Sequence, residues 1–217
     1  AIPLPEDDSL FVDASVYHWR AVDEQSVCAS QTGRHEESLM LCRRLLARAD
    51  IPDEDRGRIA RNRDQSVPAM LLKTSTYPDM LVPNVVGHQH DALVTVSLIA
   101  GPDVHATESA LNTFMNCCLD LPGAHRFLIL DTGLATRDQA SLRAQYPFLE
   151  FIKFAPSAEP LAELNALRNQ INGRYWLHLD QGWLFFSPEN FIGRLRAVLD
   201  AEPTVVAEDG WSGTATV

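Results

Sequence analysis

The sequence predicts an α/β protein: a mostly parallel sheet of the nucleotide-binding type, preceded by an N-terminal α-helical region. Two observations carry this prediction. In the second half of the chain, short apolar runs alternate with helical segments, and an apolar run of that kind is typical of a parallel strand covered on both faces. The first third instead shows apolar residues at helical spacing, with no strand-like run.

The helical region is assigned to residues 1–69, where three helices are expected. Leu39, Cys42 and Leu45 form an apolar series at helical spacing in the middle of this region. Gly33 separates the first two helices, as glycine does just past a helix end. The predicted helices cover residues 16–32, 35–49 and 53–67.

A linker is predicted over residues 70–92, because Pro78, Pro83 and Gly87 interrupt any sustained period. The α/β domain is assigned to residues 93–217. Ligands of such sheets bind at the carboxyl ends of the strands. The predicted strands cover residues 93–100, 126–131, 149–154 and 174–180, with a fifth from Pro203, and the predicted helices cover residues 106–118, 136–146, 160–172 and 188–200.

Composition excludes several classes of function. The chain has 18 Lys and Arg against 29 Asp and Glu, for a net charge of −11, whereas a nucleic-acid binder usually shows a basic face. No apolar run reaches the length of a membrane span. The cysteines form no Cys-x-x-Cys pair, and we interpret them as reduced core thiols of a cytoplasmic protein. They are Cys28, Cys42, Cys117 and Cys118.

Two of the predicted strands end in an acid, Asp131 in LILD and Asp180 in LHLD. An acid in this position can accept hydrogen bonds from a ribose or a base, or can bind a divalent cation together with a diphosphate. The alternative is helix N-capping, because Asp is common between a strand and the next helix. Both interpretations stay open for each acid, and their occurrence on two strands favours ligand binding.

Residues 93–206 resemble the nucleotide-binding half of the family 2 glycosyltransferases, which have the GT-A fold. The stretch VTVSLIAGPDVHATESALNTFMNCC stands where this family has its first strand and helix. LDTGLA stands where the family has a VDDGS-like turn whose acid contacts the nucleotide. The resemblance therefore gives Asp131 and Gly133 a nucleotide-binding role.

Two further elements extend the resemblance. ALRNQ matches the family's ARN element, which adds Arg168 and Asn169 to the expected nucleotide site. HLDQGW stands at the family's DxD-type metal motif, where only Asp180 matches an acid, because Gln181 and Gly182 supply no second carboxylate. The resemblance thus implies a Mg²⁺ or Mn²⁺ ion at Asp180 beside the leaving diphosphate, or else a metal-independent or decayed site.

The function implied by the resemblance is an inverting glycosyltransferase that takes a nucleotide-sugar donor. In the family, the acceptor site and the catalytic base lie beyond the fifth strand, where this chain has only AEDGWSGTATV. We therefore assign no catalytic base and expect the domain to be incomplete. The alternative is a non-catalytic scaffold built on a decayed glycosyltransferase fold.

The helical region resembles a tetratricopeptide-type hairpin over WRAVDEQSVCASQTGRHEESLMLCRRLLAR. Similar helical segments precede bacterial glycosyltransferase domains. A lone repeat of this kind cannot bury its own apolar face, so it packs on other helices or on another chain. The resemblance therefore implies a possible protein partner for this region.

The sequence contains three further features with weaker functional signals. GHQHD, with His88, His90 and Asp91, suggests a metal site, but a solvated linker is the favoured interpretation. His178 alternates within a strand and is expected to be a hydrogen-bonded core histidine. Trp183 is expected to pack beneath the site. The sequence contains no Walker A or GxGxxG phosphate loop, which disfavours ATPase and nicotinamide functions.

Overall fold

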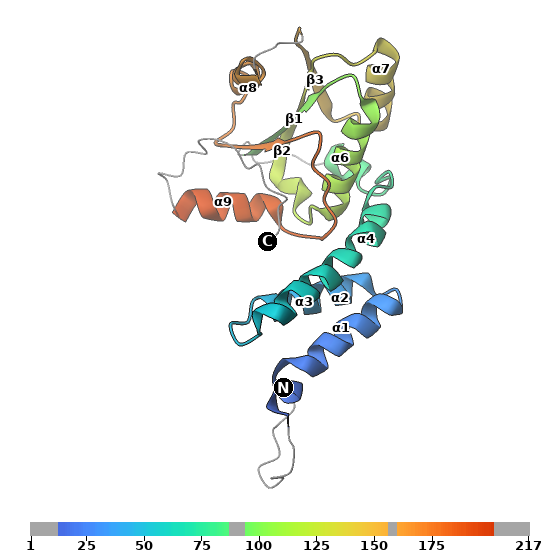
Figure 1. Cartoon of the computed structure of the whole chain (residues 1–217). Coiled ribbons are helices and arrows are strands. Elements are labelled where there is room, and N and C mark those ends of the chain that lie inside the picture. The colour runs from blue at the N-terminus through green and yellow to red at the C-terminus, as the bar shows by residue number, and fades with distance from the viewer. Residues whose placement is uncertain (1–12, 87–93, 156–159, 202–217) are drawn as a thin grey trace. The chain divides into compact units, whose positions relative to one another are not determined.

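The structure, a computed structural model, describes residues 13–86, 94–155 and 160–201 and divides the chain into two compact units. The helical unit comprises the chain up to Thr76 together with Phe185–Ser187. The sheet unit comprises Tyr77–Leu184 and the chain from Pro188 onward. Each unit is described by itself (Figure 1).

Four helices and a π-helical turn make up the helical unit within the described residues. The turn between the first two α-helices contains Gly33, whose φ of 77° lies in the left-handed region that favours glycine. The predicted third helix ends at Gln65, and a fourth helix, from Val67 to Thr74, extends into the predicted linker. Pro68 stands in the first turn of this fourth helix, where its missing N–H is not needed. The elements are the π-helical turn Val16–Arg20, α1 (Ala21–Gln31), α2 (His35–Leu46), α3 (Asp53–Gln65) and α4 (Val67–Thr74).

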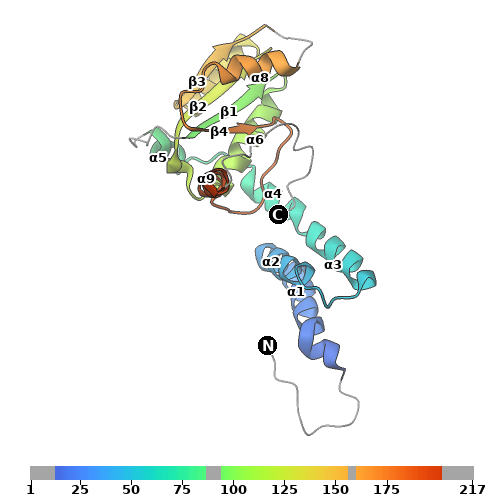
Figure 2. The same cartoon turned by 90° about the vertical axis from the view of Figure 1, so that its left-hand side faces the viewer.

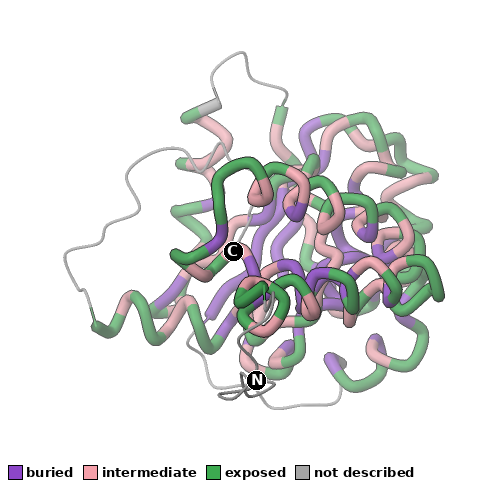
Figure 3. The backbone as a smooth tube through the Cα atoms, turned by 60° about the horizontal axis from the view of Figure 1, so that its bottom comes forward, coloured by how far each residue is buried: buried purple, intermediate pink, exposed green. Residues whose placement is uncertain are grey.

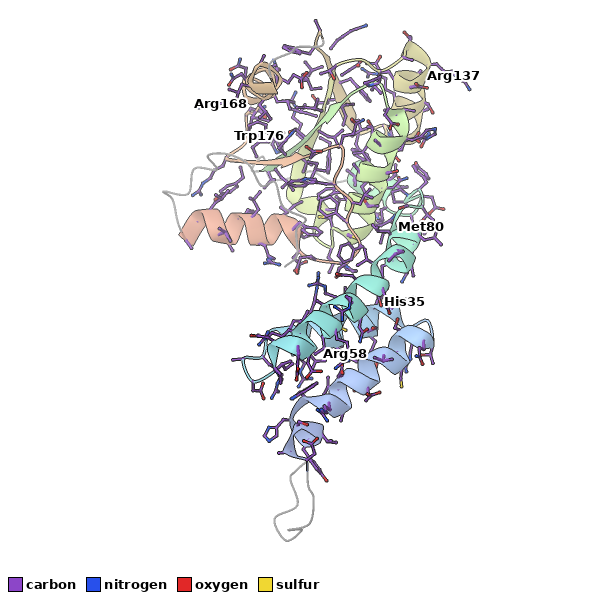
Figure 4. All side chains as sticks on the ribbon, viewed as in Figure 1. His35, Arg58, Met80, Arg137, Arg168 and Trp176 are labelled. Atoms are coloured by element: carbon purple, nitrogen blue, oxygen red, sulfur yellow. The ribbon has the colours of Figure 1, made fainter. Side chains whose placement is uncertain are left out.

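The core of the helical unit combines apolar side chains with the buried carboxylate of Asp23, which pairs with a half-buried arginine. The apolar cluster consists of Trp19, Cys42, Leu45, Ile51 and Ile59. Beside it, the buried carboxylate of Asp23 lies 2.7 Å from the Arg58 guanidinium, which also pairs with Asp55. Figure 4 labels Arg58 on its helix.

The prediction that all the cysteines lie in the core is wrong for Cys28. All of them are free thiols, and Cys28 is exposed, whereas the other three are buried. The reason is its position on α1, where Asp23, Ser26 and Ala29 form the buried face at intervals of three residues. Cys28 falls outside this stripe because successive helical residues point in different directions.

The sheet unit contains a four-stranded parallel sheet with strand order β3-β2-β1-β4, which confirms the predicted α/β class and the helical region before it. The predicted fifth strand lies outside the described residues. The strands are β1 (Val94–Ala100), β2 (Ala124–Asp131), β3 (Leu149–Lys153) and β4 (Tyr175–Leu179).

Helices cover both faces of this sheet. α6 and α7 connect strands in the same direction along the sheet, so right-handed crossovers place both on one face. α8 leads back from β3 at one edge to β4 at the other and therefore lies on the opposite face, while α9 lies on the side of α6 (Figure 2). The helices of this unit are α5 (Val82–Val86), α6 (Val104–Cys117), α7 (Thr136–Gln145), α8 (Pro160–Arg168) and α9 (Phe191–Ala201), with a 3₁₀ turn at Leu121–Gly123.

The strands hold the core of the sheet unit, and buried positions gather along them (Figure 3). Every residue of β1 except Ile99 is buried. On the α8 face, Leu128 and Leu130 of β2 pack against Leu167 of α8, with Trp176 of β4 beside them. None of the described helices is both long enough and apolar enough to cross a membrane.

Candidate functional site

The carboxyl ends of three neighbouring strands bring the two predicted acids to one edge of the sheet. Asp131 is the last residue of β2 and pairs in register with Ala100 of β1. On the other side of β1, Leu179 pairs with Leu98, so Asp180 follows one residue further along. Because neighbouring strands lie roughly 4.8 Å apart, the backbones at the two acids are about 10 Å apart across β1.

Asp131 and Asp180 belong to opposite faces of the pleated sheet. Asp131 shares the register level of Ala100 and therefore belongs to the face covered by α6 and α7. Continuing the alternation of β4 by one residue places Asp180 on the same face as His178, toward α8. The two acids thus bracket the end of β1 from its two sides.

The Asp131 carboxylate is buried, with 4% of the residue exposed, and it holds the turn between β2 and α7 together. Its Oδ1 accepts hydrogen bonds from the backbone N–H groups of Gly133 (3.1 Å) and Leu134 (2.8 Å). Its Oδ2 accepts one from Gln139 Nε2 at 3.2 Å. α7 itself begins with Ala135 at its N-cap, so Asp131 braces the turn without capping the helix.

Gly133 stands where this turn meets the loop after β1. A Cβ at this position would lie 3.6 Å from Pro102 Cδ, an ordinary van der Waals contact. The neighbouring Thr132 donates its backbone N–H to the Ala100 carbonyl at 2.9 Å. The turn that carries Gly133 is therefore fixed against the end of β1.

Asp180 differs from Asp131 in that it is exposed and has an unused carboxylate oxygen. Its Oδ1 accepts a hydrogen bond from the Gly182 N–H at 2.7 Å, and its backbone carbonyl accepts one from Trp183 N at 3.0 Å. Its Oδ2 makes no hydrogen bond to any residue that the structure describes. Asp180 is therefore the strand-end acid that is open to a ligand.

Gln181 ties the loop after β4 to the start of α6. Its Nε2 donates to the Asp103 carbonyl and to Thr107 Oγ1, each at 2.8 Å. Asp103 in turn caps α6 by accepting the Ala106 N–H at 3.2 Å. The Gln181 amide and the Asp103 carboxylate are thus both engaged in local structure.

The donor set at Asp180 does not fit a divalent cation. Mg²⁺ and Mn²⁺ sites in proteins use several oxygen ligands with carboxylates among them. Among residues 13–86, 94–155 and 160–201, no group of three or more His, Cys, Asp or Glu side chains could hold a metal ion. Asp180 and Asp103 each keep one carboxylate oxygen that bonds to no described residue, but they do not form such a group, so no chemical step is derived through a metal.

Arg168 and Asn169 are not brought together with the two acids. They stand at the C-terminal end of α8 and just beyond it, and α8 leads from the carboxyl end of β3 back to the amino end of β4. The following Gln170 carbonyl accepts a hydrogen bond from Arg126, and Asn172 lies 3.4 Å from His125, both near the start of β2. A nine-residue helix is about 13 Å long, which separates these residues from the carboxyl edge.

Lys153 is a residue at this edge that sequence reasoning missed. It ends β3, is exposed, and pairs in register with Asp131. It forms no ion pair with any described residue. It stands one residue before the end of the predicted strand 149–154, but its place beside Asp131 depends on the register of β3 against β2.

His178 is held by a hydrogen bond, as expected for a core histidine, and is half-buried. Ser97 Oγ lies 2.9 Å from its Nδ1, and Trp176 Nε1 donates to the same Ser97 Oγ at 2.6 Å. Burial lowers the pKa of His178, and the nearby Asp180 charge opposes this shift. The His-Leu-Asp spacing places His178 beside Asp180, because residues two apart on a strand share a face.

The remaining predicted residues are placed as follows. His88, His90 and Asp91 lie outside the described residues. Trp183 is half-buried in the turn after Asp180, in line with a packing role.

Comparison of the chain with known protein families, with functionally described proteins and with solved structures finds no match to any of them. The geometry of the site and the motifs in the sequence therefore carry the functional argument.

Proposed function

We propose that the carboxyl edge of the sheet binds a nucleotide-sugar and that the chain contributes the donor site of a GT-A-type glycosyltransferase. The observation that supports this most is the position of Asp131 and Asp180 at the ends of the two strands that flank β1. Parallel α/β sheets bind ligands at this edge. The glycosyltransferase-like turn LDTGLA and the strand-end LHLD supply these two acids.

In this proposal one acid contacts each end of the nucleotide-sugar. The Oδ2 of Asp131 has a single hydrogen bond, to Gln139, so it can accept a second one from a nucleoside N–H or O–H. Asp180, exposed on the far side of β1, faces the part of the donor beyond the nucleoside. The diphosphate joins these two parts and would lie between the two acids, over the end of β1, and because Arg168 lies away from this edge, no described cation is assigned to it.

Transfer with inversion also needs a base that takes a proton from the acceptor hydroxyl. No described residue is assigned this role. The proposal therefore concerns donor binding first, and transfer only as its consequence.

Isothermal titration calorimetry with UDP, UDP-glucose, GDP and GDP-mannose, with and without Mn²⁺, tests the donor site. We expect the protein to bind either UDP and UDP-glucose or GDP and GDP-mannose. Asp180→Asn should weaken binding of the nucleotide-sugar about tenfold, since a hydrogen bond to a charged group contributes roughly 1.5 kcal/mol. The control is Glu24→Gln, which removes one negative charge from an exposed position on α1 and should leave the affinity unchanged. No binding by folded protein, or unchanged affinity in both Asp180→Asn and Asp131→Asn, would overturn the proposal.

A second candidate is a non-catalytic scaffold whose helical unit binds a protein partner. The observation that favours it is the use of the Asp131 carboxylate within its own turn, together with the missing second acid after Asp180. A partner retained through residues 16–66 by protein that binds no nucleotide would support the scaffold. Hydrolysis of a nucleotide-sugar by the purified chain would count against it.

A further inference from the structure

A chain of hydrogen bonds joins β1 to β4 on the α8 face, one pleat before Asp180. Trp176 Nε1 donates to Ser97 Oγ at 2.6 Å, and Ser97 Oγ lies 2.9 Å from His178 Nδ1. Ser97 and His178 are register partners, so the bond runs directly between neighbouring strands. Ser97 is buried, and the two rings are half-buried with their centroids 5.8 Å apart.

This chain favours the tautomer of a neutral His178 that carries its proton on Nε2. An indole N–H only donates, so Ser97 must accept the bond from Trp176. The single hydroxyl hydrogen of Ser97 is then free to be donated to His178 Nδ1. A neutral imidazole that accepts at one nitrogen carries its hydrogen on the other, which makes Nε2–H a donor.

The donor Nε2–H has a free acceptor beside it. The structure gives His178 Nε2 no hydrogen bond to any described residue. Asp180, two residues further on, shares the face and keeps Oδ2 unused. The end of β4 therefore presents one donor and one acceptor next to each other.

The charge of Asp180 decides which part of the nucleotide-sugar can bind to His178 and Asp180. Without a metal ion, a carboxylate repels a diphosphate, because like charges disfavour one another at close range. A neutral hydroxyl instead donates well to a carboxylate, and a neighbouring hydroxyl oxygen can accept from an N–H. A pair of adjacent sugar hydroxyls matches both groups.

We infer that His178 and Asp180 bind two hydroxyl groups of the donor sugar without a metal ion: Asp180 accepts from one, and His178 Nε2–H donates to the other. The inference rests on the proposed function and deepens it by assigning the end of β4 to the sugar. The diphosphate, which joins the sugar to the nucleoside, would then lie over the end of β1, between the two acids.

Two variants of His178 separate ligand contact from a structural role. In His178→Asn, the side-chain oxygen reaches the place of Nδ1 and can accept from Ser97, but nothing reaches the place of Nε2. In His178→Gln, the amide nitrogen reaches the place of Nε2, while the bond to Ser97 is lost. His178→Asn therefore removes the donor to the ligand, and His178→Gln removes the bond to Ser97.

Calorimetry on the full chain uses whichever pair the wild-type protein binds, UDP with UDP-glucose or GDP with GDP-mannose. We expect His178→Asn to weaken the nucleotide-sugar roughly tenfold, to leave the plain nucleotide unchanged, and to bind the sugar more weakly than His178→Gln does. The reverse ranking, or equal loss of nucleotide and nucleotide-sugar, would show a structural role and overturn the inference. A wild-type protein that binds the nucleotide-sugar no more tightly than the nucleotide would overturn it too.

Long-range ¹H–¹⁵N correlation spectra of the histidine rings test the same arrangement without a ligand. They should show His178 with its hydrogen on Nε2, and a hydrogen on Nδ1 would overturn the inference. If the wild-type protein binds none of the nucleotides, the proposed function fails and this inference fails with it. Nucleotide binding with unchanged sugar affinity in His178→Asn overturns this inference alone.

Discussion

The ends of β2 and β4 carry nearly the same sequence, LILD and LHLD, but their acids have opposite environments. Asp131 is buried and accepts three hydrogen bonds from its own turn and from α7. Asp180 is exposed and accepts one side-chain hydrogen bond, from Gly182. A strand-end acid in an α/β sheet can thus be engaged mainly in its own turn or be exposed at the sheet edge, and the motif alone does not separate the two.

The residues that follow each acid explain the difference. After Asp131 the chain folds back so that the N–H groups of Gly133 and Leu134 both point at the carboxylate. After Asp180, the Gln181 side chain turns away to the Asp103 carbonyl and Thr107, and only one N–H reaches the carboxylate.

Asp131→Ala should lower the free energy of unfolding by about 3 kcal/mol, because it leaves the donors of a partly buried turn without their charged acceptor. Urea unfolding followed by circular dichroism measures the change. Asp131→Asn keeps an oxygen for the two backbone N–H groups and should lose less than half as much. Equal stability of Asp131→Ala and Asp180→Ala would contradict the structural role assigned to Asp131.

Gly182→Asp should create the metal site that the wild-type chain lacks, because it restores two acids in a DxD arrangement after β4. The new Cβ would lie 3.3 Å from Asp180 Oδ1, which brings the second carboxylate close to the first. Paramagnetic broadening of amide signals by Mn²⁺ should report binding at least roughly tenfold tighter in the variant, about 1.4 kcal/mol. Equally tight Mn²⁺ binding at Asp180 in the wild-type protein would contradict the conclusion that the residues around Asp180 do not hold a divalent cation.

Gln139→Ala should cost about 1 kcal/mol of stability, because it removes the one hydrogen bond to Asp131 Oδ2. The same change frees that oxygen. Nucleotide affinity measured by calorimetry should therefore stay the same or rise. A clear fall in affinity would place Gln139, and not Asp131, in contact with the nucleoside.

Asp180→Ala should change the free energy of unfolding by less than about 0.5 kcal/mol, because the side chain is exposed and supports only its own turn. The same urea unfolding measurement applies. A loss as large as that of Asp131→Ala would mean that both strand ends serve the fold, and the comparison would collapse.

The sequence predicts the sheet and its edge well, because apolar runs and helical spacing are local signals. The alternation of strands and helices places Asp131 and Asp180 at one edge once the sheet is parallel. Positions within helices are less well predicted. Arg168 and Asn169 match a motif, but the structure places them at the end of α8 that lies away from the carboxyl edge. An error of three or four residues in placing a helix moves a side chain by a whole turn along it.

Contacts between distant segments are the part that the sequence does not predict. The bond between Ser97 and His178 joins residues 81 positions apart and depends on the register of β1 against β4. The ion pair between the buried Asp23 and Arg58 depends in the same way on how α1 and α3 pack. Lys153 becomes notable only because β3 pairs with β2 in the register that puts it beside Asp131.

Mapping of amide chemical shifts on addition of a nucleotide-sugar tests the central claim most directly. The account predicts that the shifts concentrate at residues 101–103, 132–134 and 180–183, which form the carboxyl edge of the sheet. Shifts confined to the helical unit, or to the amino edge near Arg168 and Asn172, would contradict it.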